Sequence, residues 1–538
     1  MLRHLVLAAA LPAVLSSFAL AGPPAAGTPL KADWQYSRDG GKTFSPAAPT
    51  IQADRVPNIA RDSVSAKCTF TIDDPAKIGL LKLRSSAADG AFALTDGDSI
   101  DRYNVGTKPN LLNMKLLVNG KTVPDLDPYV LYRYVSIDPA ILNKGANTIT
   151  VSGVFWFQLA AETEAGLALE TLPPDLAVLD RLPVLGGIGE DYFGLTARSV
   201  IPAEFVVSVT PTDPAGPEQQ HPFPRGRWLK ARVPVAKGAK AIKYTVTVKA
   251  AGGSKTYGPY DVKMPTMGVG FKFVAAGNTA VYLGHTERFK SFMDKLLQIR
   301  PDVFVHVGNY VNIMPWDFSW SDMFFDVAPE TLARVPTLAV CGAGEMGSPT
   351  MFSRMFYFAP DDKDYGHWTA VYGKVRFIAM EAWSQSAAKD PAAAAAWLDE
   401  ILRDAKEDYV IVLNHSPSHT STPNASRLFR PGIAHTKKHV NPILVKHKVT
   451  LTLGGHHTQY ERAEPPAAEG VMTIMTCMAG GSGKPLQPGY VKDNPCSKAT
   501  FNGDHYVVFE VKANSLEMQT IDLATGKVVD TYSFKPRK

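Results

Sequence analysis

The stretch "RPDVFVHVGNYVN", residues 300–312, shows how the part of the chain between Phe271 and Arg462 is built. An apolar run rich in β-branched and aromatic residues is followed at once by a polar loop with a glycine. Five segments share this arrangement, and we expect each apolar run to be a short strand buried on both faces. The predicted strands are Phe271–Ala276, Val303–Val307, Pro336–Val340, Tyr409–Leu413 and Val449–Leu453. Loops at such strand ends are where α/β folds gather functional groups, so these five loops are the candidate site.

Two segments between these strands have the spacing of amphipathic helices. In residues 285–300 the apolar side chains recur every three or four positions, and residues 391–407 repeat the pattern with an alanine-rich start. The apolar positions are Phe289, Phe292, Met293, Leu296 and Leu297 in the first segment and Trp397, Leu398, Ile401 and Leu402 in the second. Alternation of strands with helices predicts an α/β domain from about Met267 onward.

The loop sequences resemble those of the calcineurin-like metallophosphoesterases, and within them the purple acid phosphatases. The resemblance rests on "VHVGNYVN", "VPTLAVCGAGE", "YVIVLNHSPSH" and "LTLGGHHTQYER". These follow the order and spacing of the family pattern, which is an Asp after the first strand, then GDxxY, GNH[DE], VxxH and GHxH. The resemblance implies a four-layer α/β/β/α fold and seven ligands around two metal ions.

Five of the seven family ligand positions hold other residues in this chain. His415 matches the VxxH ligand and His456 the first His of GHxH, so two metal ligands are retained. The substituted ligand positions are Asn278, Asn309, Asn312, Ala343 and Thr458. Gly344 stands where the family has the His that is thought to donate a proton. No catalytic residue is therefore assigned.

These substitutions predict a dismantled metal centre. A carboxylate bridge holds two like-charged ions together, whereas Asn278 and Asn309 offer neutral carbonyls and Ala343 no side-chain ligand. Without metal ions no bound water becomes a hydroxide nucleophile near neutral pH. We therefore expect no cofactor and a pseudophosphatase that acts by binding or scaffolding.

Two alternatives for the same loops stay open. His415, His456 and His457 with Glu345, His306 or His419 could hold one zinc, iron or manganese ion, which would make the protein an active phosphoric-ester hydrolase. The pocket residues Glu345, His457 and Asn414, together with the asparagines, could instead hydrogen-bond a sugar or a phosphate. The simplest view is that asparagine merely replaces aspartate where no cation balances a charge.

The residues before Met267 predict all-β domains. Segments 65–165 show alternating strands that resemble a galactose-binding-like jelly roll, which would direct the chain to a polysaccharide. The predicted divisions are 1–21 (signal peptide), 22–64 (leader and hairpin), 65–165 (jelly-roll-like domain), 166–266 (linker and a fibronectin/Ig-like β-sandwich, as the larger purple acid phosphatases carry) and 267–538 (phosphoesterase domain).

Composition and the first residues bear on location and partners. The formal charge is +5 with both signs interspersed, which does not suggest nucleic-acid binding. Met1 to Ala21 reads as a signal peptide with cleavage near Ala21, and no later stretch has the length of an apolar membrane span. We expect a secreted or periplasmic protein whose partner is an extracellular glycan or a phosphorylated ligand.

The four cysteines are compatible with an oxidising compartment. Cys477 and Cys496 flank a Gly/Pro-rich loop, and they form either a disulfide or two free thiols. Cys341 lies beside the third loop and is expected to be a packed core thiol.

Overall fold

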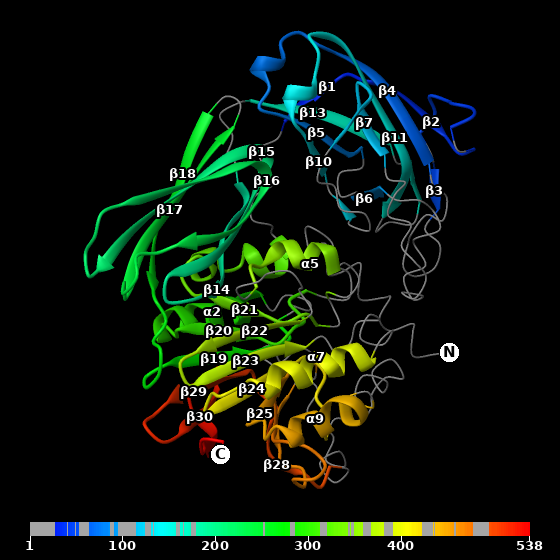
Figure 1. The fold of residues 1–538 in the computed structure, drawn as a ribbon. Coiled ribbons are helices and arrows are strands. Elements are labelled where there is room, and N and C mark those ends of the chain that lie inside the picture. Colours follow the sequence, from blue (N-terminus) through cyan, green and yellow to red (C-terminus); the bar gives the residue numbers. More distant parts are fainter. Residues whose placement is uncertain are drawn as a thin grey trace.

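The computed structural model describes most of the chain in three β-rich or α/β parts (Figure 1). The described residues are 27–39, 41–48, 50–52, 64–86, 91–94, 115–123, 131–132, 134–157, 162–164, 166–173, 179–250, 253–279, 286–311, 320–342, 345, 349–358, 367–380, 391–421, 434, 436–456, 459–476 and 494–537. The predicted signal peptide lies outside them. None of the helices in these ranges is long and apolar enough to cross a membrane.

The first part is an antiparallel sandwich of two sheets with one core. The smaller sheet has the order β1 (Thr28–Leu30), β13 (Leu167–Leu172), β5 (Leu80–Ser85) and β10 (Tyr134–Ile137). The larger sheet contains β2 (Asp33–Ser37), β4 (Val64–Ile72), β11 (Gly145–Phe157), β6 (Ala91–Leu94), β9 (Leu131–Tyr132), β7 (Lys115–Val118) and β8 (Lys121–Thr122). Alternate residues of β4 are buried, as expected for strands with one face in a core. A ribbon of β3 (Thr50–Gln52) and β12 (Glu162–Glu164) and the 3₁₀ turns η1 (Pro75–Lys77) and η3 (Pro139–Ile141) complete this part.

The strand β13 corrects the domain division after residue 165. Its residues fall in the range assigned to the linker and second domain, but β13 pairs with β5 and β1 of the first sandwich. Its buried leucines belong to the sandwich core. Residues 167–172 therefore complete the first domain.

The second part, where a fibronectin/Ig-like β-sandwich is predicted, is a β-sheet domain whose five strands are hydrogen-bonded into one bent sheet. Its strands are β14 (Leu179–Ile188), β15 (Tyr192–Asp213), β16 (Gln219–Pro234), β17 (Ala241–Ala250) and β18 (Gly253–Lys263). The 22-residue β15 pairs with β14 along its first half and with β17 along its second. Its register against β16 shifts between Arg198 and Ala203. Such an irregularity bends a sheet, so long strands can run through a corner without dividing into two sheets.

The third part has the predicted four layers. One sheet has the order β21 (Thr337–Ala339), β20 (Val303–His306), β19 (Lys272–Ala276), β29 (His505–Val511), β30 (Leu516–Asp522) and β31 (Val528–Phe534). The other has the order β22 (His367–Tyr372), β23 (Val375–Met380), β24 (Tyr409–Asn414), β25 (Leu451–Gly454), β27 (Thr473–Met475), β26 (Tyr460–Ala463) and β28 (Ser497–Phe501). All five predicted strands are present, and neighbours among them pair in parallel. The sheets pack face to face through rings such as Phe273 and Phe377, whose centroids lie 5.0 Å apart.

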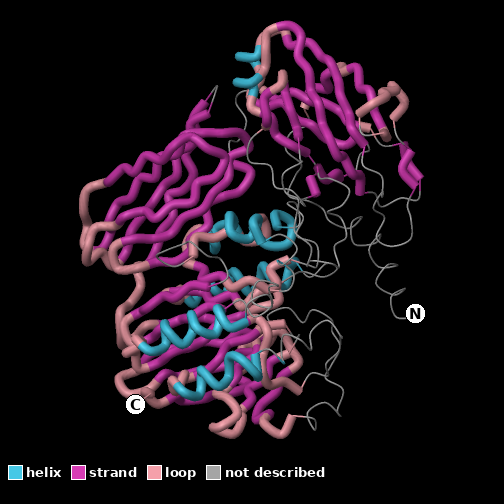
Figure 2. The backbone as a smooth tube through the Cα atoms, turned by 45° about the vertical axis from the view of Figure 1, so that its right-hand side comes forward, coloured by secondary structure: helices cyan, strands magenta, loops and turns pink. Residues whose placement is uncertain are grey.

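Helices cover the outer faces of both sheets (Figure 2). The predicted helices are α2 (Thr286–Ile299), which buries Phe289, Phe292, Met293 and Leu296, and α7 (Pro391–Arg403). Leu398 and Leu402 of α7 share a core with Ile378 and Val410 of the second sheet. The remaining helical segments are η4 (Ser321–Phe325), α4 (Pro329–Leu332), α5 (Pro349–Met355), η6 (Thr436–Val440) and α9 (Asn441–Lys446).

The second and third parts are packed tightly together. Tyr357 lies so close to the backbone of β14 and β15 that a Cβ atom at Gly186 or Gly194 would collide with it. Tyr244 of β17 donates a hydrogen bond to the carbonyl of Ala333 at 2.8 Å, and Thr196 donates to that of Met355 at 2.8 Å. Both donors are buried, so the bent sheet forms a fixed base for the phosphoesterase-like part.

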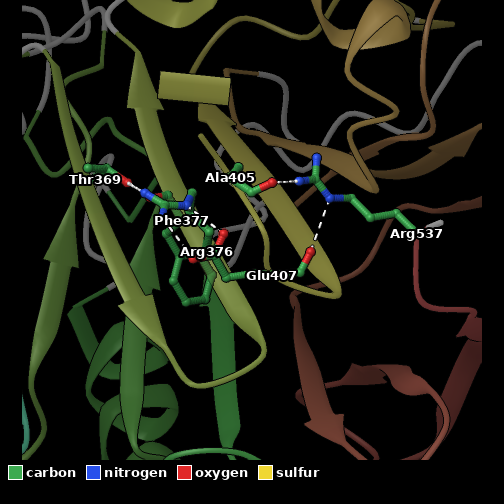
Figure 3. Close-up of polar contacts among 6 residues, drawn as sticks. All are labelled: Thr369, Arg376, Phe377, Ala405, Glu407 and Arg537. Atoms are coloured by element: carbon green, nitrogen blue, oxygen red, sulfur yellow. Dashed lines mark hydrogen bonds and ion pairs between the residues drawn. The ribbon is translucent and has the colours of Figure 1, made fainter. Parts of the chain in front are cut away.

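A polar clamp joins the end of the chain to the second sheet (Figure 3). Arg376 of β23 binds both carboxylate oxygens of Glu407, at 2.8 and 2.7 Å. Arg537 donates to the carbonyls of Ala405 and Glu407 in the segment after α7 and to that of His447 after α9. One guanidinium therefore ties together the segments that follow two helices.

Candidate functional site

The candidate site forms where loops after the central parallel strands meet. The loops are joined through their backbones: the N–H of Asn278 donates to Gly308 at 2.8 Å, that of Gly455 to His415 at 3.0 Å and that of Thr476 to Gly454 at 2.9 Å. Glycine is required for this approach, because a Cβ atom at Gly308 would lie 2.6 Å from Nδ1 of His415. The predicted convergence of loops is thus present among the described residues.

Three residues of this site have left-handed backbone angles. Asn278, Asn309 and His456 have φ values of +50°, +60° and +73°. Such angles are uncommon for residues with a side chain, although asparagine tolerates them better than most. Strained backbone of this kind clusters at functional sites, where the surrounding structure holds it in place. The three left-handed residues therefore mark the loops that meet here as a candidate functional site.

His415 is a buried neutral imidazole with one free nitrogen. Its Nδ1 lies 2.7 Å from the carbonyl oxygen of Val307, which can only accept, so Nδ1 carries the proton. Its Nε2 is buried and has no hydrogen-bond partner among the described residues. Burial lowers the pKa of His415 to about 4, although the bond to Val307 opposes the shift. The Nε2 lone pair is therefore available as an acceptor at neutral pH.

The second retained family position, His456, lies beside the first. The two rings are 5.3 Å apart between centroids and nearly perpendicular. The backbone N–H of His456 donates to Oδ1 of Asn278 at 3.2 Å. Asn278 is only 7% exposed, so its amide oxygen joins two loops at the position where the family pattern has a metal-binding carboxylate.

Glu345, expected to line the pocket, is fully buried and ties two loops together. Its carboxylate accepts backbone hydrogen bonds from Gly342, Tyr310, Asn309 and Val311, at 2.7, 2.8, 2.9 and 3.3 Å. Burial raises the pKa of Glu345 to about 7, and the four N–H donors oppose this rise. With its oxygens engaged in this way, Glu345 is poorly placed to bind a metal ion or a ligand.

The other expected donors also have structural partners. Nε2 of His306 lies 2.7 Å from Oγ1 of Thr279, and its Nδ1 accepts from the N–H of Gly308 at 3.2 Å. Nδ1 of His419 lies 3.0 Å from Oγ of Ser418. Burial lowers the pKa of both rings, that of His419 to about 4. His306 has no nitrogen left for a metal ion.

Asn414 shapes the loop that carries His415. Its Oδ1 accepts from the N–H of Ser416 at 3.1 Å, and its Nδ2 donates to Oγ1 of Thr436 at 3.4 Å. The expected pocket residue is therefore 3% exposed and occupied within the loop. Asn312, Ala343, Gly344, His457 and Thr458 lie outside the described residues.

Sequence reasoning missed two hydroxyl groups in these loops. Oγ of Ser416 and Oγ1 of Thr476 are buried, and neither has a hydrogen-bond partner within the part of the chain that the structure describes. Neither residue belongs to a family motif, and only the folded chain shows how their hydroxyls are placed.

Three of the four cysteines lie in the described ranges. Cys341 is buried, as expected for a packed core thiol, Cys68 is buried too, and Cys496 is a partly buried free thiol. Cys477 lies outside the described residues.

The donor set does not fit a two-metal centre. Within the described ranges, no group of three His, Cys, Asp or Glu side chains is placed to hold a metal ion. The two imidazoles are accompanied by neutral asparagines, and the carboxylate of Glu345 is bound by backbone N–H groups. Two like-charged cations would find no bridging anion among these described side chains.

The four-layer fold and the order of its loops define a domain of the metallophosphoesterase class. Residues 281–460 match the model of the calcineurin-like phosphoesterase family, so the chain contains a domain of that family. Among curated proteins, none matches this chain.

Two solved structures are similar in fold. Purple acid phosphatase PPD1 from yellow lupin (Lupinus luteus) seeds is 13% identical, with a TM-score of 0.55 and coverage of 94% of this chain and 96% of that one. PhoD is 9% identical, with a TM-score of 0.50 and coverage of 65% of this chain and 88% of that one. At such identities the likeness concerns the fold alone, and function has to be argued from the site.

Proposed function

We propose that this chain is a purple-acid-phosphatase-like pseudophosphatase, which binds a ligand at the loop cluster without hydrolysing phosphoesters. The observation that carries the proposal is the use of Asn278, whose side-chain oxygen bonds the backbone of His456. A neutral amide in that role holds the loops together without any cation. The same position would need a carboxylate if it were to bind a metal ion of a dinuclear centre.

The remaining polar groups support the proposal. Hydrolysis in this family requires a metal-bound hydroxide, and neutral His415 with its asparagine neighbours could not replace the charge of two metal ions. The buried carboxylate of Glu345 is bound by four backbone N–H groups, so it is also unsuited to act as a general base.

One observation favours the alternative of a single metal ion. No described residue bonds the lone pair of His415 Nε2, and the His456 ring is close by, as two ligands of one zinc, iron or manganese ion would be. Such a site would need at least one further ligand from residues outside the described ranges. The protein would then be an active hydrolase of phosphoric esters.

Metal content and turnover test the proposal together. The purified protein is analysed for metals, and hydrolysis of p-nitrophenyl phosphate is followed with added zinc, iron or manganese. We expect substoichiometric metal and no turnover above the buffer. Stoichiometric metal together with turnover would instead establish the single-ion enzyme. In that case His415→Ala should abolish the turnover, and the control His505→Gln should retain it. His505 is a suitable control because it is an equally buried histidine on β29.

We further propose that the protein is secreted or periplasmic, on the evidence of the residues before Ala21. An extracellular glycan or phosphorylated molecule would then be the ligand available to it. Amino-terminal sequencing of the protein from the producing cell tests this, with a start at Gly22 expected and an intact Met1 contradicting it.

A further inference from the structure

Among the described residues of the loop cluster, three buried polar atoms have no hydrogen-bond partner. They are Nε2 of His415, Oγ of Ser416 and Oγ1 of Thr476, in residues that are 1%, 0% and 0% exposed. Buried polar groups are almost always hydrogen-bonded, because leaving one unpaired costs about 1–3 kcal/mol. Three such atoms lie in adjoining loops, and each keeps the capacity to hydrogen-bond a group that the described residues do not supply.

These atoms come from neighbouring strand ends. His415 and Ser416 follow β24, Thr476 follows β27, and β25 lies between these two strands. The end of β25 and the loop after it are hydrogen-bonded to the loops after both neighbouring strands. The N–H of Gly455 donates to the carbonyl of His415, and the N–H of Thr476 donates to the carbonyl of Gly454. Thr476 also borders the first loop, since a Cβ atom at Gly277 would lie 3.3 Å from its carbonyl oxygen.

The hydrogen-bonding character of the three atoms limits the ligand. Nδ1 of His415 donates to Val307, so Nε2 can only accept, and a group that binds it must donate. The two hydroxyls of Ser416 and Thr476 can donate or accept. A phosphate near neutral pH is mainly an acceptor and favours cationic donors, whereas a sugar hydroxyl both donates and accepts.

We infer that this loop cluster recognises the hydroxyl groups of a neutral carbohydrate, with His415 Nε2 accepting from a sugar hydroxyl and Thr476 and Ser416 completing the contacts, and that it discriminates against phosphate. The inference rests on the proposed binding function and specifies its ligand class. The site has then exchanged the chemistry of phosphoester binding for that of a polyol while keeping the loop geometry.

The unpaired hydroxyls make a sharp test possible. Thr476→Val replaces a buried, unpaired hydroxyl by a methyl group of the same shape, so the free protein should be as stable as before or more stable. Carbohydrate affinity should fall, because the ligand loses a hydrogen bond. Thr337→Val is the matched control, since Thr337 on β21 is 1% exposed and its hydroxyl is also unpaired, but it lies at the start of its strand, away from the loops.

The full-length protein is screened on an array of neutral oligosaccharides, and the strongest hit is titrated by calorimetry beside inorganic phosphate. We expect the oligosaccharide to bind at least tenfold more tightly than phosphate. Thr476→Val should weaken it threefold to tenfold without lowering the melting temperature, Ser416→Ala should act similarly, and Thr337→Val should leave affinity unchanged.

Three results would overturn the inference. The first is an array without any neutral oligosaccharide bound, and the second is phosphate binding as tight as that of the sugar. The third is carbohydrate binding that Thr476→Val and Ser416→Ala leave unchanged, which would assign it to another part of the chain such as the first sandwich. The metal and turnover assay decides the proposed function separately, so the two failures are distinguishable.

Discussion

The side-chain oxygen of Asn278 accepts a hydrogen bond from the backbone N–H of His456, and this bond joins the loops after β19 and β25. Both residues have left-handed backbone angles. The two loops are thus held together here by an uncharged contact.

Replacing this amide by a carboxylate tests whether a cation is needed. Asn278→Asp keeps the acceptor but places a charge at a 7% exposed position. Burial raises the pKa of such a carboxyl above its unfolded value, so stability falls as pH rises through that interval. We expect a loss of about 1–3 kcal/mol at pH 8 relative to the parent and less at pH 5, measured by urea denaturation. Full stability at pH 8, or its recovery with added zinc or manganese, would show that the site still holds a cation.

Gly308 combines an unusual backbone angle with a close approach. Its φ is +92°, and an added Cβ atom would press on His415. Gly238 has a similar φ of +86° but nothing within 4 Å of that position. Gly238→Ala should therefore cost only the backbone strain of about 1–2 kcal/mol, and Gly308→Ala clearly more. Both variants are compared by urea denaturation. If Gly308→Ala and Gly238→Ala lose the same free energy of unfolding, the loops around Gly308 can move apart at no energetic cost.

Buried histidines predict sensitivity to acid. Burial lowers the pKa of His415, His419 and His505 to about 4 each, whereas an unfolded histidine titrates near 6.5. The unfolded chain therefore binds more protons between these values, and stability is lost as pH falls from 6.5 to 4. The urea midpoint should drop steadily as pH falls over this range. His505→Gln should reduce the pH-dependent change in the free energy of unfolding by about 3 kcal/mol. A midpoint that stays level from pH 6.5 to 4 would contradict the prediction.

The clamp formed by Arg537 predicts that the end of the chain contributes to stability. Arg537→Ala removes hydrogen bonds to three backbone carbonyls that follow α7 and α9. We expect a loss of about 1–3 kcal/mol in the free energy of unfolding. Lys535→Ala, at an exposed position of the same segment, is the control and should change stability by less than about 0.5 kcal/mol. A similar loss in both variants would show that the guanidinium contacts contribute nothing specific.

Much of the phosphoesterase-like domain could be predicted from local patterns. The apolar runs that became β19, β20, β21, β24 and β25 are short and rich in β-branched and aromatic residues, and the helical spacing in α2 and α7 is regular. The bent second sheet could not be predicted, because its single-sheet connectivity depends on the pairing of β15 with three strands. The place of β13 in the first sandwich was missed for the same reason, since its partner β5 lies more than eighty residues earlier.

The sequence by itself determined which atoms this site can offer: imidazoles at 415 and 456 and neutral amides at 278 and 309, where the family pattern has carboxylates. Residue identity alone decides charge and ligand type, so the prediction that this chain lacks a dinuclear donor set needs no coordinates. Only the tertiary structure decided how those atoms are used. Glu345 accepts hydrogen bonds from four backbone N–H groups, and Asn278 joins two loops. Nε2 of His415 has no hydrogen-bond partner in the described ranges. Hydrogen-bond partners and burial arise from residues brought together across the fold, and no local pattern in the chain contains them.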